Sequence, residues 1–182
     1  MLLLASLPAA AQEEPWHFAR LMAQLAQVQA TQARYSEVRR VAVLQKPLQL
    51  SGTLLYERPA LIEKRQILPF SEVIRVEGDW LTVERVGKTR RVALVNEPLV
   101  AALVESLRAT LAGDGAELER LYSASVSGTR QRWTLALTPR DLEVAGVVKG
   151  ISIAGSGSRI VRLEILEPGG DCSVMTIHEK SP

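Results

Sequence analysis

Six short segments in the first half of the chain alternate apolar and polar residues, and a proline or glycine lies at or near the end of each. A period of two sends successive side chains to opposite faces of a β-strand. Short strands at regular spacing, separated by tight turns, are typical of an antiparallel meander. The predicted strands are residues 35–46, 51–58, 61–68, 71–77, 80–86 and 89–95. The pattern therefore predicts an antiparallel sheet.

Two segments show helical periodicity instead. From residue 13 to about 31, apolar residues recur at spacings of three and four, and Pro15 suits a first helical turn. A second helix is predicted over 97–111, and Gly113 ends it. The two apolar stripes consist of Phe18, Leu21, Met22, Leu25 and Val28, and of Leu99, Val100, Leu103, Leu107 and Leu111.

The second half of the chain returns to strand periodicity after a short helical turn that Asp114 caps. Strands are predicted at about 120–126, 132–137, 147–154, 159–166 and 172–178, with an irregular segment at 139–146. Val161, Leu163 and Ile165 alternate with charged residues, which gives the sheet one dry and one wet face. We therefore expect an α+β fold with about eleven strands in one curved sheet, whose apolar face the helices cover.

The first twelve residues, MLLLASLPAAAQ, form an apolar run that ends in small residues. This resembles the second half of a secretory signal peptide, and a truncated start would explain the missing basic leader. We expect a signal peptide at 1–12 and a single domain at 13–182; an apolar N-terminus on a cytosolic protein is the alternative. Cys172 is the only cysteine, so no intrachain disulfide forms. A net charge of +2 is too weak to predict nucleic-acid binding.

Patterns for bond-breaking chemistry are missing from the sequence. His17 and His178 are the only histidines, and Cys172 with His178 lacks a convincing third metal ligand. Residues 155–158 read Gly-Ser-Gly-Ser, a hairpin turn between strands rather than a nucleophile elbow. A loose basic set on the meander suits a solvated face: Arg34, Arg39, Arg40, Lys64, Arg65 and Arg75. We predict neither an enzyme nor a cofactor.

A local motif adds a family resemblance. Residues 52–59, GTLLYERP, resemble the Gly-x-Leu-x-x-x-Arg-Pro segment of the periplasmic lipoprotein-carrier family, LolA, and 78–81, GDWL, are similar to one of its turns in shortened form. Residues 99–112 occupy the place of the family's lid helices. The resemblance implies an incomplete, strongly curved antiparallel β-barrel with helices over its concave apolar face. It also implies a monomer in the periplasm of a Gram-negative bacterium, which takes acylated cargo from an inner-membrane transporter to an outer-membrane acceptor.

The resemblance also implies roles for single residues. Strand parity places Leu54, Tyr56 and Arg58 on one face. In the family, the arginine bonds to the lid and holds it shut when empty, and Ile62 falls at the entrance. A surface arginine and ordinary core packing of the second helix are the alternatives. The expected lipid-binding residues are Leu54, Tyr56, Arg58, Ile62, Ile74, Val76, Leu99, Val100, Leu103 and Leu107.

The sequence departs from the family pattern after the Arg-Pro corner. Lys64 and Gln66 stand where family interiors are usually rich in aromatic residues, and aromatics make up only 4% of the chain. This indicates a divergent branch, whose cargo is a lipoprotein or another acylated molecule such as a glycolipid. The rival hypothesis is a sensor or interaction module on the same scaffold, which binds lipidated or misfolded envelope proteins.

Overall fold

The computed structural model describes residues 16–179, so the expected signal peptide at 1–12 lies outside the described residues. One antiparallel sheet of eleven strands has the order β6-β5-β4-β3-β2-β1-β11-β10-β9-β8-β7. The first and last strands of the described chain, β1 and β11, pair in the middle of this sheet. The strands are β1 Ala30–Arg40, β2 Leu48–Glu57, β3 Leu61–Leu68, β4 Glu72–Glu77, β5 Trp80–Arg85, β6 Lys88–Ala93, β7 Tyr122–Thr129, β8 Arg132–Pro139, β9 Gly150–Ser156, β10 Arg159–Leu166 and β11 Cys172–Glu179.

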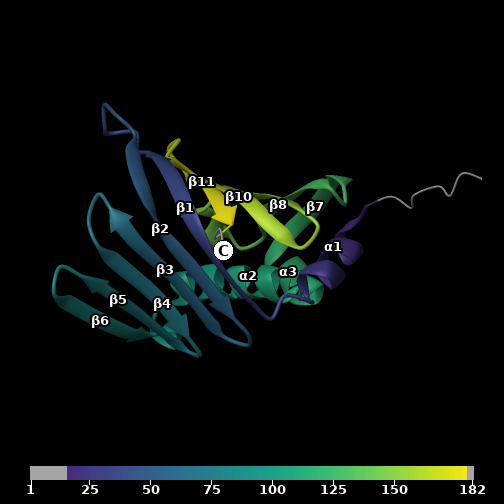
Figure 1. Ribbon diagram of the computed structural model, residues 1–182, viewed down its shortest axis with the longest axis horizontal. Coiled ribbons are helices and arrows are strands. Elements are labelled where there is room, and N and C mark those ends of the chain that lie inside the picture. The colour runs from purple at the N-terminus through teal and green to yellow at the C-terminus, as the bar shows by residue number, and fades with distance from the viewer. Residues whose placement is uncertain (1–15, 180–182) are drawn as a thin grey trace, which may run out of the picture.

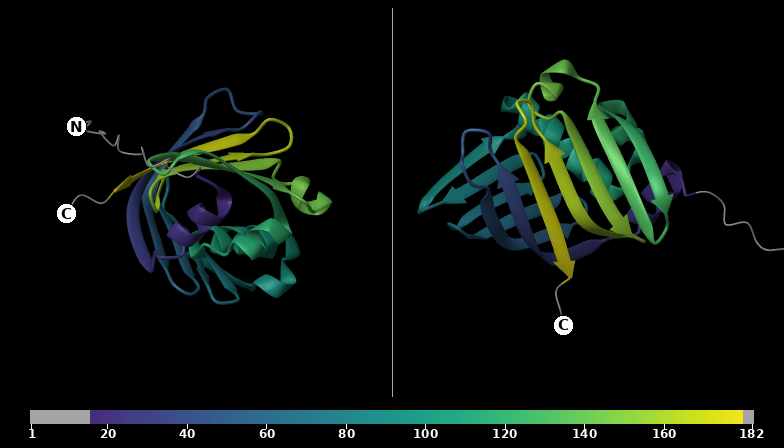
Figure 2. Two further views of the ribbon diagram at one scale, coloured as in Figure 1. Left: turned by 90° about the vertical axis from the view of Figure 1, so that its right-hand side faces the viewer. Right: turned by 90° about the horizontal axis from the view of Figure 1, so that it is seen from above.

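The sheet curls around the helices without closing, because its end strands β6 and β7 do not pair with each other. Figure 1 shows α2 and α3 crossing the concave side, and the left view of Figure 2 shows the strands wrapped around α1 and α2. The helical elements are α1 Phe18–Leu25, η1 Leu94–Asn96, α2 Pro98–Ala112, α3 Gly115–Leu121 and α4 Leu142–Ala145. The expected fold class, an incomplete curved barrel with helices on its concave face, is confirmed.

Two apolar clusters hold the helices against the sheet. The larger one packs α1, α2 and α3 on β7–β9 and includes fully buried Trp133 and Leu135. The smaller one packs α2 and η1 on β4 through Val76, Leu94 and Val104. Removing apolar side chains from water stabilises such clusters by about 25 cal/mol per Å². Most of the packing therefore lies at the C-terminal half of the sheet.

Gly113 sets how closely α1 and α2 approach each other. It follows α2 with φ 69°, a left-handed conformation that favours glycine. A Cβ there would lie 2.2 Å from the Met22 carbonyl oxygen and 2.5 Å from the Ala26 nitrogen. Only glycine therefore allows the end of α2 to lie against the end of α1.

The first helix is shorter than the sequence predicts. It ends at Leu25 rather than near residue 31, and Ala30 already pairs with Glu57 in the sheet. Strand pairing therefore overrides a weak helical pattern, since propensity is a small term beside tertiary contacts. Within the predicted irregular segment, Asp141 caps the short helix α4.

The second helix buries a different face from the predicted stripe. Its buried residues are Val104, Ser106, Ala109 and Thr110, whereas Leu107 is 37% exposed. The helix packs against both clusters at once, through Val104 in one and Ala109 in the other. A helix between two clusters has two contact faces, and the predicted stripe reaches only one of them, through Val100 in the smaller cluster. Across 16–179, no helix has the length and apolar character needed to cross a membrane.

Candidate functional site

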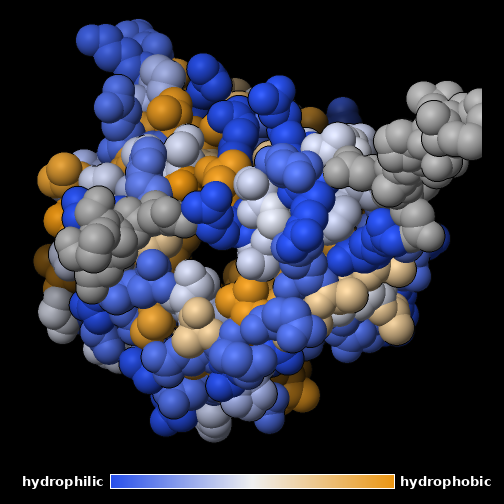
Figure 3. Space-filling model, turned by 45° about the vertical axis from the view of Figure 1, so that its right-hand side comes forward, coloured by the Kyte–Doolittle hydropathy of each residue, from blue (hydrophilic) through white to orange (hydrophobic). Residues whose placement is uncertain are grey.

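A cavity of about 1020 Å³ lies between the concave face and the C-terminal part of α2. This is at the upper end of the range of about 300–1,000 Å³ typical of ligand pockets. Strands from both halves of the sheet contribute to its wall. The lining is mostly apolar and includes Val28, Leu54, Tyr56, Ile62, Leu107, Leu111, Ile160, Leu163, Met175 and Ile177. Figure 3 shows the surface hollowed near its centre, beside hydrophobic residues.

The register of β1, β2 and β3 explains which side chains point inward. Tyr56 pairs with Ile62, and Leu54 pairs with Lys64, so each pair shares one face of the sheet. Gly52 lies on the same row, where a Cβ would lie only 1.9 Å from the Arg65 carbonyl oxygen. The glycine of the Gly-x-Leu motif therefore allows β2 and β3 to approach closely at the register shift between residues 51 and 52.

Arg58 connects the sheet to both helices at one point. Its Nη2 donates to the carbonyl oxygens of Ala26 at 2.9 Å and Ala112 at 2.5 Å. Its Nε donates to the Val28 carbonyl oxygen at 3.0 Å. Ala26 follows α1 and Ala112 ends α2, and a helix C-terminus has unpaired carbonyls and a partial negative charge. We call this group the Arg58 junction: one guanidinium satisfies the ends of both helices beside the cavity.

The helix wall of the cavity consists of Leu107, Thr110 and Leu111. Leu107 is exposed because it faces this open space rather than a packed neighbour. The Thr110 hydroxyl donates to the Ser106 carbonyl at 2.8 Å, so it is satisfied within the helix. The wall therefore offers apolar surface without an unpaired hydroxyl.

The other predicted lining residues lie elsewhere. Val76, buried, and Val100 pack in the smaller apolar cluster together with Ile62. Ile74, half-buried, pairs with Lys64 on the neighbouring strand, and Leu103 is a half-buried residue of α2. Leu99 lies at a different pocket. Of the ten predicted residues, the structure brings Leu54, Tyr56, Ile62 and Leu107 to the cavity and places Arg58 beside it.

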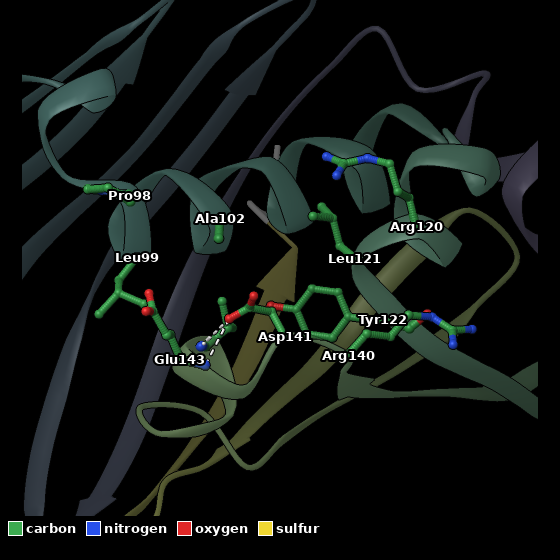
Figure 4. A pocket seen from close by; sticks show the side chains of 10 residues that line it. Pro98, Leu99, Ala102, Arg120, Leu121, Tyr122, Arg140, Asp141 and Glu143 are labelled. Carbon is green, nitrogen blue, oxygen red and sulfur yellow. Dashed lines mark hydrogen bonds between the residues drawn. The ribbon is translucent and has the colours of Figure 1, made fainter.

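That other pocket, of about 450 Å³, lies between the start of α2, α3 and α4. Figure 4 shows the Tyr122 ring across it, with its hydroxyl toward Asp141. Tyr122 is 1% exposed, and its hydroxyl has no hydrogen-bond partner. Arg140 donates from Nε to the carbonyls of Glu119 and Tyr122, which fixes the chain around the pocket. The walls are mixed in polarity, unlike those of the large cavity.

A buried polar cluster adjoins the large cavity and was missed from the sequence. Lys64 donates to Glu37 at 2.5 Å, and the Ser173 hydroxyl donates to the other oxygen of Glu37 at 2.6 Å. Glu37 is only 5% exposed, so the pair is desolvated on one side. Lys64 was expected on a solvated face, and this expectation is wrong. Strand parity would have found it, because Lys64 follows Ile62 by two residues.

Burial also raises the pKa of two tyrosine hydroxyls here: that of Tyr56, which lines the cavity, and that of Tyr35, which lies against Lys64. Desolvation, together with the negative charges of Glu37 and Glu72, raises the pKa of Tyr35 above 10.0. Desolvation raises the pKa of Tyr56 as well, and the nearby Arg58 charge opposes that rise. Both hydroxyls are buried without a hydrogen-bond partner.

Metal chemistry finds no support in the described part of the chain. Residues 16–179 contain no group of three histidine, cysteine, aspartate or glutamate side chains placed to hold an ion. His178 instead lies 3.0 Å from the Ser36 hydroxyl across β1 and β11.

The fold and cavity define a class of protein: an unclosed antiparallel barrel with helices against its concave face and apolar space between them. The chain belongs to the family described as outer membrane lipoprotein carrier protein LolA-like, whose sequence model matches residues 10–176. A search of curated proteins found no matching relative.

Among solved structures, the chain is similar to a LolA superfamily protein from Nitrosomonas europaea, with 12% identity and a TM-score of 0.47 over 90% of this chain and 93% of that one. It is also similar to a DUF1329 family protein from Desulfovibrio piger, with 10% identity and a TM-score of 0.44 over 88% of each chain. A third is the Mycobacterium tuberculosis lipoprotein LppX, with 11% identity and a TM-score of 0.38 over 89% of this chain and 97% of that one.

Proposed function

We propose that this protein is a periplasmic carrier that holds the acyl chains of lipoproteins or related lipids in its large cavity. It receives this cargo from an inner-membrane transporter and delivers it to an outer-membrane acceptor. The observation that carries the proposal is the apolar cavity of about 1020 Å³ beside the Arg58 junction. Family membership supports it.

The binding free energy of an acyl chain suits such a cavity. Each methylene removed from water contributes about 0.8 kcal/mol, so about a dozen of them supply roughly 10 kcal/mol before losses. Ordering the chain and moving the helices reduce this value. The result is a complex that holds its cargo in water and still releases it to a competing apolar site.

The Arg58 junction provides the opposing free energy. Hydrogen bonds that involve a charged group contribute about 1.5–3 kcal/mol each. Cargo that pushes α2 away from the sheet breaks the bond between Arg58 and Ala112, and release allows that bond to form again. When α2 closes onto the sheet, the hydrogen bond between Arg58 and Ala112 forms again, and its free energy offsets part of the binding free energy of the cargo. This is our physical reason for assigning Arg58 the role of a latch.

The test is binding of a fluorescent fatty acid and of a diacylated lipopeptide, with mass spectrometry of lipids that co-purify from a Gram-negative periplasm. Ala33→Trp places a large ring in the cavity wall, and Ala102→Trp does the same in the smaller pocket as a matched control. We expect the first variant alone to lose binding. Wild-type protein that takes up neither probe and carries no lipid would contradict the proposal.

A further inference from the structure

Large apolar side chains are exposed at the first, third and fifth turns of the N-terminal half of the sheet. Val43 in the β1–β2 loop is 87% exposed, Leu68 at the β3–β4 turn is 59% exposed, and Val86 at the β5–β6 turn is 81% exposed. Leu44 and Phe70 lie beside them and are also exposed. Single exposed apolar residues are ordinary, whereas a group of them at one edge indicates a contact surface.

The three turns lie at the same end of the sheet. Every second connection of an antiparallel meander falls at one end, and Figure 1 shows these three turns along one margin of the molecule. The Arg85 guanidinium stacks 4.1 Å above the Phe70 ring, so two of the turns contact each other. The β1–β2 loop is held by a 2.7 Å bond from the Ala42 amide to Asp171. We call residues 39–48, 65–72 and 84–90 the hairpin margin.

Val86 is held in a conformation that its side chain disfavours. Its φ is 47°, the only positive value at a non-glycine position among residues 16–179, and Gly87 follows with φ 71°. Two positive φ values in a two-residue hairpin turn favour asparagine followed by glycine, and a β-branched residue is an outlier there. Because Val86 is exposed, packing within the protein does not explain the choice. Contact with a surface outside the chain would explain a strained, exposed valine at this turn.

The hairpin margin is also the basic part of the protein. It contains seven basic and two acidic residues, a net charge of +5, whereas the whole chain carries +2. The neighbouring β10–β11 turn contributes Glu167 and Asp171, and Glu167 pairs with Arg39 at 3.1 Å. Two margin arginines also pair with acids outside it, Arg65 with Glu63 at 3.0 Å and Arg90 with Glu97 at 3.3 Å. Counting all four of these acids leaves +1. Among the described residues, the margin cations without a carboxylate partner are Arg40, Lys46 and Lys88, and they accompany the exposed apolar side chains.

We propose that the hairpin margin docks onto an anionic phospholipid surface, with the valine and leucine side chains in the interfacial layer and the arginines and lysines among the phosphates. Apolar tips flanked by basic residues match both parts of such an interface. This docking goes beyond the proposed carriage of acyl chains and does not rest on it, because the cavity residues lie outside the margin.

The experiment is flotation of the protein with vesicles of phosphatidylglycerol and phosphatidylcholine, and with phosphatidylcholine alone. We expect binding to the anionic vesicles that weakens with added salt. Val43→Asp and Val86→Asp should each reduce it several-fold, while Val95→Asp should not, because Val95 is equally exposed at 83% but lies at the other end of β6. The cavity variant Ala33→Trp should bind vesicles normally. No vesicle binding would overturn the proposal and leave a protein as the partner of the margin. Equal binding to neutral vesicles, or an equal loss in Val95→Asp, would overturn it as well.

Val86→Asn separates contact from folding. Asparagine suits the left-handed position, so we expect the thermal midpoint to rise while vesicle binding falls. An unstable variant is therefore not the cause of the lost binding. A higher midpoint with unchanged vesicle binding would remove the β5–β6 turn from the contact.

Discussion

In the C-terminal half of the sheet, β7–β9 are packed tightly against α1 and α3, and the Trp133 ring lies over Gly155, where a Cβ would come within 2.2 Å of it. In the N-terminal half, β1–β3 face a cavity and the ion pair between buried Glu37 and half-buried Lys64 instead. Both halves belong to one sheet with one pattern of alternation. The comparison indicates that β7–β9 serve as the scaffold, whereas the strands in the middle of the sheet leave space and polar groups for function.

The largest expected effect is loss of the scaffold. Trp133→Ala should lower the free energy of unfolding by about 3–5 kcal/mol, because it removes a fully buried ring and leaves a hole. Urea denaturation at neutral pH measures this. Val76→Ala in the smaller cluster should lower the free energy of unfolding by markedly less. Equal losses in the two variants would show that the halves do not differ in this respect.

The second largest effect is expected from loss of the Arg58 junction. Arg58→Leu removes the donor to three carbonyl oxygens, and we expect the free energy of unfolding to fall by about 2–4 kcal/mol. Cargo binding should persist while transfer to acceptor membranes slows, because closing no longer restores the junction. Arg34→Leu, at an exposed position on β1, is the control for removing an arginine. Unchanged transfer in Arg58→Leu would refute the latch role.

A smaller effect is expected at the polar cluster. Lys64→Met leaves Glu37 buried without its cation, so the unfolding free energy should fall by about 1–3 kcal/mol. Arg65→Met, one residue along on the outer face, should change it by less than about 0.5 kcal/mol. Denaturation of both variants side by side decides the matter. If the two substitutions lower the free energy of unfolding equally, the Lys64–Glu37 pair contributes no more to stability than a surface arginine does.

The smallest effect concerns Tyr35. Its pKa is raised above 10.0 in the folded protein, so its contribution to stability is complete below pH 10 and is lost as the pH rises further. Tyr35→Phe removes both the titrating hydroxyl and an unpaired buried oxygen. We expect the variant to be at least as stable as the wild type at pH 8, because the unpaired oxygen is gone, and to lose less stability by pH 11. Urea midpoints across this range test it, and parallel curves would contradict it.

Much of this architecture is readable from the sequence. Periodicity predicts ten of the eleven strands to within about three residues, because each has one dry face and turns that contain proline or glycine. The exception is the first strand, predicted at 35–46, which is Ala30–Arg40, because pairing with β2 extends it toward α1 and residues 41–47 form the loop. The motif around Arg58 is equally local: Gly52 and Arg58 have backbone and charge requirements that other residues do not meet.

What the sequence does not predict depends on contacts between distant segments. The end of α1 at Leu25 follows from the pairing of β1 with β2, and the buried face of α2 follows from two clusters on either side of it. Strand parity alone places Lys64 inward, but its partner Glu37 and the Ser173 hydroxyl that shares Glu37 are 27 and 109 positions away along the chain. Nothing near Lys64 in the sequence identifies its partners.

The unpaired end strands β6 and β7 have a consequence for the size of what the protein can enclose. A closed barrel has a radius fixed by its strand number and stagger. An open sheet is free of that constraint, so its curvature can relax outward while every existing strand pair stays intact. The interior volume is then set by the distance between the helices and the sheet. One protein can therefore accommodate ligands of different size.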